Sequence, residues 1–379
     1  MAEKVMSKVL FIRQENYEQT GIDAAILRAF EHFGGARNFI SKGDRVLLKV
    51  NLVSGHDPER RVTTDPSIVR SAAKIVIESG GTPFIADSPG IDSFKNAAEK
   101  AGFMNIAREL GIECRELSDP VNLPVNDDAD FRRIQVSRDV LESDKVINLA
   151  KLKTHGQMYL TMGVKNLFGC VPGRLKAGWH YNVGLSREKF ASLLLDIYLG
   201  VKPSFTILDG VIGMHGDGPT SGDPYNFGII GACVDALSMD FTLCKMLGGK
   251  LEDYPLYMAA KKRNLPQCES FSSEIEGDID SSHIFPGVKI PKTRSMRLMP
   301  NIPFFDRLMT SKPVHIPEKC IGCGRCAEIC AAHALRHENK HLYFDYAKCI
   351  RCYCCHEMCP VKAIKFKESF LVKLVNMIS

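Results

Sequence analysis

The sequence contains no run of about 18 apolar residues, the length that a membrane-spanning helix requires. Its N-terminal stretch, MAEKVMSKVLFIRQENYEQTG, lacks the apolar core and the small-residue cleavage site of a signal peptide. Neither the phosphate-loop pattern nor the dinucleotide fingerprint G-x-G-x-x-G occurs, so NAD and ATP are not predicted ligands. Net charge is small, at +5, and does not favour a nucleic-acid partner. We therefore expect a cytoplasmic protein without a transmembrane segment.

Cysteine is abundant by contrast. The 379 residues include 14 cysteines, and a chain of this length is expected to form more than one domain. Nine of the cysteines lie between Cys320 and Cys359. In a reducing compartment, such clustering indicates a metal site rather than a disulfide framework.

Residues 1–290 alternate between apolar, β-rich segments and segments with helical spacing. Nearly continuous apolar strands favour a mostly parallel sheet with helices on both faces, and therefore an α/β domain. Asp65 and Pro66 are typical of a helix start, because Asp caps the first turn and Pro is tolerated there. We expect strands at 8–14, 45–51, 82–87, 145–153 and 204–210, and helices at 21–35, 66–79, 188–200 and 235–248.

Two further segments separate from this domain. Residues 291–315 are rich in proline and basic side chains, which predicts a linker, although their apolar residues also allow a contact between domains. Residues 369–379 end the chain as an amphipathic tail that either packs on the protein itself or touches a membrane surface.

The cysteine cluster repeats one pattern twice. C-x-x-C-x-x-C-x-x-x-C runs from Cys320 to Cys330 and again from Cys349 to Cys359, which is the spacing of bacterial two-cluster ferredoxins. The pattern predicts a small α+β ferredoxin-like domain over residues 316–368 with two 4Fe–4S clusters. Structural zinc is disfavoured, because it prefers paired C-x-x-C units. The predicted ligands are Cys320, Cys323, Cys326 and Cys359 for the first cluster, and Cys349, Cys352, Cys355 and Cys330 for the second.

The repeats are not identical. Ala331 follows the first repeat where Pro360 follows the second, which affects the local turn but not the number of ligands. Cys354 is surplus to the pattern, and we expect a spectator thiol near a cluster.

Polar residues mark the ends of several predicted strands in the large domain. In open α/β sheets, ligands bind beyond the carboxyl ends of the strands, so these residues outline one candidate crevice. Each of them could instead serve as a turn former or a helix cap. The predicted substrate-binding residues are Asn51, Asp87, Lys153 and Asp209.

The stretch from Lys153 to His180 combines basic side chains with glycines. Backbone N–H groups with lysines nearby suit phosphate or carboxylate ligands, and a desolvated lysine can act as a nucleophile or a base. The alternative is a solvated basic loop. The predicted catalytic residues are His155, Lys165 and His180.

Several segments resemble the domain-of-unknown-function 362 family: TTDPSIV (63–69), ADSPG (86–90), LKTH (152–155), GVKNLFG (163–169) and LDGVIGMHGDGP (208–219). This resemblance covers about residues 8–250. Such domains are often fused to a ferredoxin module, as is expected here.

The order His155, Lys165, His180 is also similar to a stretch of the lactate racemase family. That resemblance implies a nickel-pincer nucleotide attached to Lys165, nickel ligation by His180, and a catalytic or orienting role for His155. The surrounding residues differ, and racemisation needs no ferredoxin.

Three functional hypotheses follow. The first is an iron–sulfur oxidoreductase that passes electrons between a soluble donor and an anionic substrate or cofactor in the large domain. The second is a ferredoxin-type electron carrier or maturation partner without its own catalysis. The third is a nickel-pincer enzyme related to lactate racemase. The sequence leaves open whether the large domain holds nickel, flavin or no cofactor.

Overall fold

The computed structural model describes residues 7–90, 92–173, 175–184, 186–269, 274–291 and 311–367. We call residues 7–291 the large domain and residues 311–367 the C-terminal unit. Most of the predicted linker and all of the predicted C-terminal tail lie outside the described residues. Within the described part, no helix is long and apolar enough to cross a lipid bilayer.

A nine-stranded sheet forms the centre of the large domain, in the order β11-β1-β10-β9-β7-β2-β3-β4, with β8 paired to β7. Strands β9, β7, β2, β3 and β4 are parallel to one another, and β11 is parallel to β1. β10 runs antiparallel to both of its neighbours, and so does β8 to β7. The strands span Lys8–Arg13 (β1), Arg45–Lys49 (β2), Thr82–Asp87 (β3), Glu113–Glu116 (β4), Lys145–His155 (β7), Tyr159–Thr161 (β8), Phe205–His215 (β9), Asp223–Cys233 (β10) and Glu274–Gly277 (β11).

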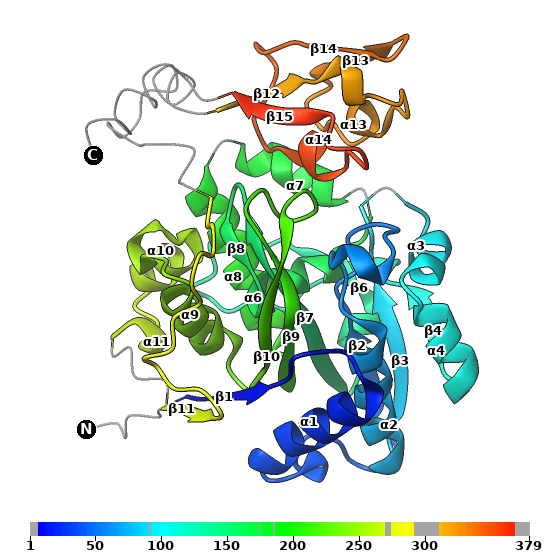
Figure 1. The fold of residues 1–379 in the computed structure, drawn as a ribbon, viewed down its shortest axis with the longest axis vertical. Coiled ribbons are helices and arrows are strands. Elements are labelled where there is room, and N and C mark those ends of the chain that lie inside the picture. Colours follow the sequence, from blue (N-terminus) through cyan, green and yellow to red (C-terminus); the bar gives the residue numbers. More distant parts are fainter. Residues whose placement is uncertain are drawn as a thin grey trace.

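Helices cover both faces of this sheet, as predicted (Figure 1). One face packs on helices α1 (Gln19–His32), α2 (Pro66–Glu78), α3 (Phe94–Lys100) and α4 (Phe103–Leu110). The other packs on α6 (Gly163–Asn166), α8 (Arg187–Val201), α9 (Ala236–Met246) and α10 (Pro255–Lys262).

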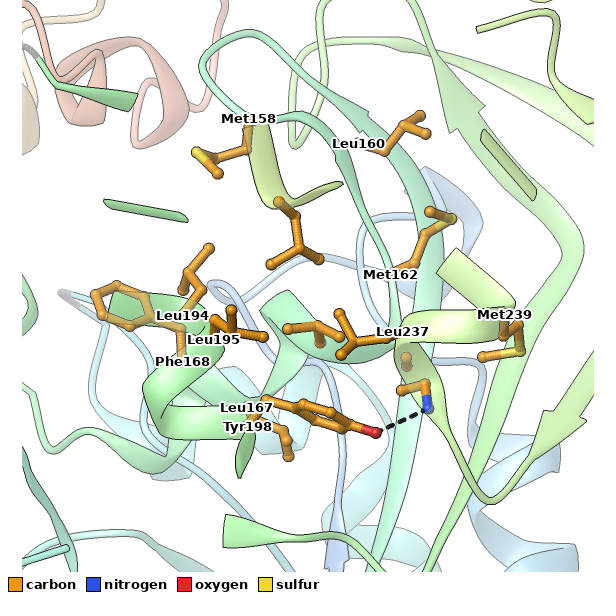
Figure 2. Packing of buried hydrophobic residues seen from close by; sticks show 14 of the residues in the cluster. Met158, Leu160, Met162, Leu167, Phe168, Leu194, Leu195, Tyr198, Leu237 and Met239 are labelled. Carbon is orange, nitrogen blue, oxygen red and sulfur yellow. Dashed lines mark hydrogen bonds between the residues drawn. The ribbon is translucent and has the colours of Figure 1, made fainter. Parts of the chain in front are cut away.

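Residues along β2 show why the strands are apolar throughout. Val46 and Leu48 belong to one core cluster, whereas Leu47 belongs to the other, because successive side chains point to opposite faces. Figure 2 shows the second of these clusters, where the hydroxyl of Tyr198 accepts a hydrogen bond from the backbone N–H of Ala236 at 3.1 Å.

The structure confirms the predicted start of α2 and corrects two strand ends. Asp65 caps α2 by accepting a hydrogen bond from the backbone N–H of Ser67 at 3.0 Å. β7 continues to His155, and β9 continues to His215, beyond the predicted end at Gly210. The reason is β10, which was not predicted and which pairs with β9 as far as His215. Asp209 therefore lies inside a strand rather than at its end.

The C-terminal unit contains two antiparallel strand pairs and two short α-helices. β12 (Lys312–His315) pairs with β15 (Ile364–Lys367), and β13 (Leu335–Glu338) pairs with β14 (His341–Phe344). Residues 312–315, which the sequence analysis assigned to the linker, thus form a strand of this unit. The two α-helices of this unit are α13 (Arg325–Glu328) and α14 (Cys354–Glu357), whereas α7 (Leu175–Val183) belongs to the large domain. Other short elements are α5 (Arg138–Leu141), α11 (Pro266–Glu269), β5 (Pro120–Asn122) and β6 (Gln135–Ser137).

Candidate functional site

A pocket of about 120 Å³ lies between the large domain and the C-terminal unit. Its floor lies beside the carboxyl ends of β2, β3 and β7, the edge at which the sequence predicts a crevice. Figure 1 shows the C-terminal unit next to α7 at this edge. The polar lining residues of the large domain are Asn51, Asp87, Ser88, Lys153, Thr161, Lys165, Asn166, Lys176 and His180, and the C-terminal unit adds Ile329, Cys354, Glu357 and Met358.

Asn51, Asp87, Lys153, Lys165 and His180 therefore meet in one place. These residues are carried by the ends of strands and by the short helices α6 and α7. His155 and Asp209 are buried and do not line the pocket.

Asp209 belongs to a buried structural network. One of its oxygens accepts a hydrogen bond from Lys151 at 2.7 Å and another from the backbone N–H of Asp65 at 2.8 Å. The other oxygen accepts from the hydroxyl of Tyr17 at 2.7 Å. Because both carboxylate oxygens are occupied and fully buried, this placement argues against the predicted substrate-binding role of Asp209.

Asp87 is similarly engaged beneath the pocket. Its carboxylate lies 3.0 Å from the ammonium of Lys49, which is fully buried, and accepts hydrogen bonds from the backbone N–H groups of Leu52 and Ser88. The positive charge of Lys49 offsets most of the negative charge of Asp87. Asp87 thus shapes the floor but adds little net charge to it.

Lys165 differs from the other lysines of the site. Lys153 donates hydrogen bonds to Asn51 Oδ1 at 2.7 Å and to the carbonyl of Val62 at 2.8 Å, and Lys176 donates to the carbonyl of Ser88. The ammonium of Lys165 has no hydrogen bond or ion pair among the residues that the structure describes. Burial lowers the pKa of Lys165, while Glu357 opposes that shift. An unpaired cation therefore faces the pocket.

The short helix that carries Lys165 is held rigidly. The buried carboxylate of Asp240 accepts hydrogen bonds from the backbone N–H groups of Gly163 and Val164, at 2.9 and 3.1 Å. A Cβ at Gly163 would lie only 2.9 Å from the side chain of Ala236, so glycine permits this close packing. The local sequence thereby fixes the point from which Lys165 extends.

The other two lysines of the pocket also have lowered pKa values. Burial lowers the pKa of Lys176 to about 8, and it lowers the pKa of Lys153 well below its ordinary range. In each case the neighbouring cations add to the effect of burial. An anionic ligand would favour the protonated form of all three lysines.

The two histidines play different parts. The Nδ1 atom of His155 accepts hydrogen bonds from the backbone N–H groups of Gln157 and Met158, at 3.1 and 3.2 Å. Its proton therefore sits on Nε2, which lies 3.3 Å from Oε1 of Glu357 in the C-terminal unit. Burial lowers the pKa of His155 well below its ordinary value, so the ring is neutral.

His180 lines the pocket directly and is only 8% exposed. Its ring packs edge-on against Phe168, with centroids 5.7 Å apart. Burial, followed by the charge of Lys165, lowers the pKa of His180 to about 3. The Nδ1 atom is buried without a hydrogen-bond partner within the described part of the chain.

The C-terminal unit closes the pocket with α14 and the residue that follows it. Burial raises the pKa of Glu357 to about 6, although Lys165 and Lys153 oppose this shift. The backbone carbonyl of Glu357 accepts a hydrogen bond from the hydroxyl of Thr220 at 2.7 Å. A second contact is the ion pair between Arg325 and Asp92, at 3.1 Å.

The two cysteine loops have the same backbone form. Gly322 and Gly324 have φ angles of 75° and 76°, and the equivalent Arg351 and Tyr353 also have positive φ, at 50° and 64°. Each fourth cysteine accepts a backbone N–H at its sulfur four residues on, from Ala334 to Cys330 at 3.2 Å and from Ala363 to Cys359 at 3.1 Å. N–H donors to thiolate sulfur and the soft donor set both fit an iron–sulfur cluster.

The thiols also lie in the neighbourhoods that the crossed ligand sets require. Burial raises the pKa of Cys326 to about 11, and the nearby thiols of Cys359 and Cys323 add to this effect. Burial likewise raises the pKa of Cys349, and here the neighbours are Cys352 and Cys330. The assignment of the eight ligands stays a prediction.

Lining residues that were not predicted as site residues include Glu357, Met358 and Lys176. Lys176 belongs to the basic stretch noted in the sequence, which could have identified it. Glu357 and Met358 carry no such signal, because only the tertiary fold brings α14 to the large domain. Cys354, expected to be a spectator, lines the pocket as well.

Comparison with known proteins agrees with the two-part organisation. Residues 46–245 match the family described as domain of unknown function (DUF362), and residues 319–369 match a 4Fe-4S dicluster domain. The thylakoid-associated protein sll1697 of Synechocystis sp. (strain ATCC 27184 / PCC 6803 / Kazusa) is 38% identical over 259 residues, which are 68% of this chain and 80% of that protein.

Two solved structures are similar to part of this chain. The lactate racemase apoprotein from Thermoanaerobacterium thermosaccharolyticum is 11% identical, with a TM-score of 0.38, covering 62% of this chain and 56% of that chain. A protein from Thermotoga maritima is 12% identical, with a TM-score of 0.37, covering 59% and 57%. This chain thus spans little more than half of either structure. It belongs to the DUF362 family and carries a C-terminal 4Fe-4S dicluster domain.

Proposed function

We propose that this protein is an iron–sulfur oxidoreductase whose clusters exchange electrons with a small anionic ligand bound in the pocket. The observation that carries the proposal is the position of the pocket. Its lining joins Lys165 of the large domain to Cys354, Glu357 and Met358 of the C-terminal unit. Cys354 and Met358 are direct chain neighbours of the predicted cluster ligands Cys355 and Cys359.

Charge supports an anionic ligand. Lys153, Lys165 and Lys176 face the pocket, whereas Asp87 is paired with Lys49. Glu357 is then the one acidic lining residue without a lysine partner at ion-pair distance, among the residues that the structure describes. In a partly desolvated site, such an excess of positive charge interacts strongly with an anion.

Roles for the predicted residues follow from their positions. Lys165 would bind the anion and donate a proton as the ligand is reduced, and His180, which lines the pocket, would contact it. His155 would act as a positioning residue, because it contacts Glu357 rather than the pocket. The unpaired Lys165 favours this reading over a bare electron carrier, which needs no pocket.

The test uses the holoprotein, reduced with dithionite and desalted without oxygen. A panel of anionic acceptors, such as 2-oxo acids and unsaturated carboxylates, is compared with their neutral methyl esters while cluster absorbance is followed. We expect reoxidation by at least one anion, no reoxidation by its ester, and loss of the reaction in Lys165→Met. The variant should still be oxidised by ferricyanide. Equal rates in the variant and the wild type with every anion would contradict the proposal.

The same preparation distinguishes the proposed oxidoreductase from a nickel-pincer enzyme. Intact mass and metal content are recorded together before reduction. Added mass on a peptide that contains Lys165, with stoichiometric nickel, would replace the proposed oxidoreductase with the pincer enzyme. An unmodified Lys165 without nickel would support the proposal made here.

A further inference from the structure

We infer that the pocket takes a small organic anion with one charged head and an apolar body, the head on the lysines of the large domain and the body against the C-terminal unit. The inference rests on the proposed function and narrows its ligand class. It follows from the way in which charged and apolar lining residues divide between the two walls.

The cationic residues all lie on one wall. Lys153 comes from β7, Lys165 from α6 and Lys176 from α7, and all three elements belong to the large domain. Only Lys165 has an ammonium group that no described residue engages. One unpaired cation supports one charged head. The hydrogen-bonded Lys153 and Lys176 add a favourable field around it.

The opposite wall is mostly apolar. The C-terminal unit contributes Ile329, Cys354 and Met358, with Glu357 as the exception. The carboxylate of Glu357 faces Nε2 of His155, so it already has a donor. Phe168 and Ala177 extend the apolar surface into the large domain. An inorganic anion would satisfy the lysines and leave this wall in contact with water, whereas an apolar body would cover it.

Size limits the body. The pocket holds about 120 Å³, and a cavity of about 150 Å³ accommodates benzene. A single ring or a short chain therefore fits, and a nucleotide does not. His180 also lines this small volume.

The orientation has a consequence for electron transfer. A body that lies against Cys354 and Met358 is one residue along the chain from the predicted ligands Cys355 and Cys359. The reducible part of the ligand would then be the part nearest to a cluster. The charged head would stay near Lys165.

Calorimetry on the oxidised holoprotein tests the inference with four probes: benzoate, acetate, inorganic phosphate and benzylamine. We expect benzoate to bind at least about tenfold more tightly than acetate or phosphate, and benzylamine not to bind. Acetate or phosphate binding as tightly as benzoate would overturn the apolar body. Binding of benzylamine would overturn the anionic head.

Two variants locate the two ends of the ligand. Ala177→Leu fills the apolar part and should weaken benzoate about tenfold while leaving acetate unchanged. Lys165→Met should weaken both. Lys42→Met is the matched control, because Lys42 is exposed in the turn before β2, away from the pocket, and should leave both affinities unchanged. Equal loss of benzoate and acetate in Ala177→Leu would contradict the orientation.

A second readout guards against a misfolded variant. Trp179 is the single tryptophan of the chain and lies in α7 between the pocket residues Ala177 and His180, with its ring edge-on to Phe131 at 5.5 Å. Its fluorescence should keep the wild-type maximum in every variant and should respond to benzoate. These readouts measure binding alone, so failure of cluster reoxidation with intact benzoate binding would reject the proposed function and not the ligand class.

Discussion

The Nε2 atom of His155 lies 3.3 Å from Oε1 of Glu357, so a buried imidazole of the large domain meets a carboxylate of α14. Backbone N–H groups hold the other ring nitrogen, and this fixes the proton on the side that faces Glu357. Glu357 stands two residues from each of the predicted ligands Cys355 and Cys359. The contact therefore ties the floor of the pocket to the helix that carries a cluster ligand.

Replacing the charge of Glu357 should strengthen anion binding. Glu357→Gln removes a negative charge near Lys165 and Lys153 and keeps the side-chain shape. We expect benzoate affinity to rise about three- to tenfold, as like-charge repulsion is removed. Titration calorimetry measures the change.

The internal repeat supplies the control for that variant. Glu328 occupies the equivalent position in the first repeat, and its side chain is exposed. Glu328→Gln should leave benzoate affinity and iron content unchanged. If the two variants behave alike, the electrostatic role assigned to Glu357 is wrong.

The ion pair between Arg325 and Asp92 should contribute to docking of the C-terminal unit. Their side chains are 33% and 13% exposed, so the expected coupling is modest, about 0.5–1 kcal/mol. Arg325→Ala, Asp92→Ala and the double variant form a cycle that is read from anaerobic denaturation. Asp92 also accepts the backbone N–H of Gly55 at 2.8 Å, so its single variant should cost more. If the losses of stability in the two single variants add up to the loss in the double variant, the ion pair does not contribute to docking.

Gly169 should tolerate no side chain. A Cβ there would overlap the carboxylate of Asp87 and lie 2.5 Å from Nζ of Lys49, which form the buried pair beneath the pocket. Gly169→Ala should destabilise the large domain by about 2–4 kcal/mol, because a packed ion pair must move or break.

Gly178 is the matched control for that variant. It lies in α7, and a Cβ at this position meets nothing within 4 Å. Gly178→Ala should be neutral or stabilise the helix by up to about 1 kcal/mol. The midpoints of thermal unfolding of the two variants measure the difference. Equal midpoints would show that the contact at Gly169 is not tight.

Anion affinity should fall as the pH rises through about 8. Burial lowers the pKa of Lys176 to that value, with Asp87, Lys49, Cys170 and Glu116 as its other charged or titratable neighbours. Below pH 8 the ammonium attracts the anion, and above it the neutral amine does not. Benzoate titrations across this range should show the step in the wild type, with Lys176→Met lacking it. If the fall in benzoate affinity near pH 8 persists in Lys176→Met, a titratable group other than Lys176 causes it.

The same shift has an opposite effect on stability. The unfolded chain holds the Lys176 proton up to a pKa near 10.5, whereas the folded protein releases it near 8. Between these values the unfolded state binds more protons, so the contribution of Lys176 to stability rises with pH. Affinity and stability should therefore change in opposite directions over this interval.

Much of the fold could be predicted because burial on both faces leaves continuous apolar strands, as in β2 and β7. β10 was not predicted, since it begins with the mostly exposed residues Asp223 to Asn226 and continues into a mostly buried half. Without it, the end of β9 was placed too early and Asp209 was assigned to the crevice.

The site could be predicted only in part, for a different reason. Asn51, Asp87, Lys153, Lys165 and His180 follow recognisable strand ends or belong to a basic stretch. The ion pair between Lys49 and Asp87 joins two different strands, so it cannot be predicted from the residues next to either of them in the sequence. Glu357 and Glu328 occupy the same position in the two repeats. They differ only in the residues that the tertiary fold places beside them.

The most direct test asks whether the pocket and the clusters form one site. The electron paramagnetic resonance spectrum of the dithionite-reduced holoprotein is recorded with and without saturating benzoate, for the wild type, Lys165→Met and Lys42→Met. We expect a benzoate-dependent change in the wild type and in Lys42→Met and no change in Lys165→Met. Spectra that are identical with and without bound benzoate in the wild type would contradict it.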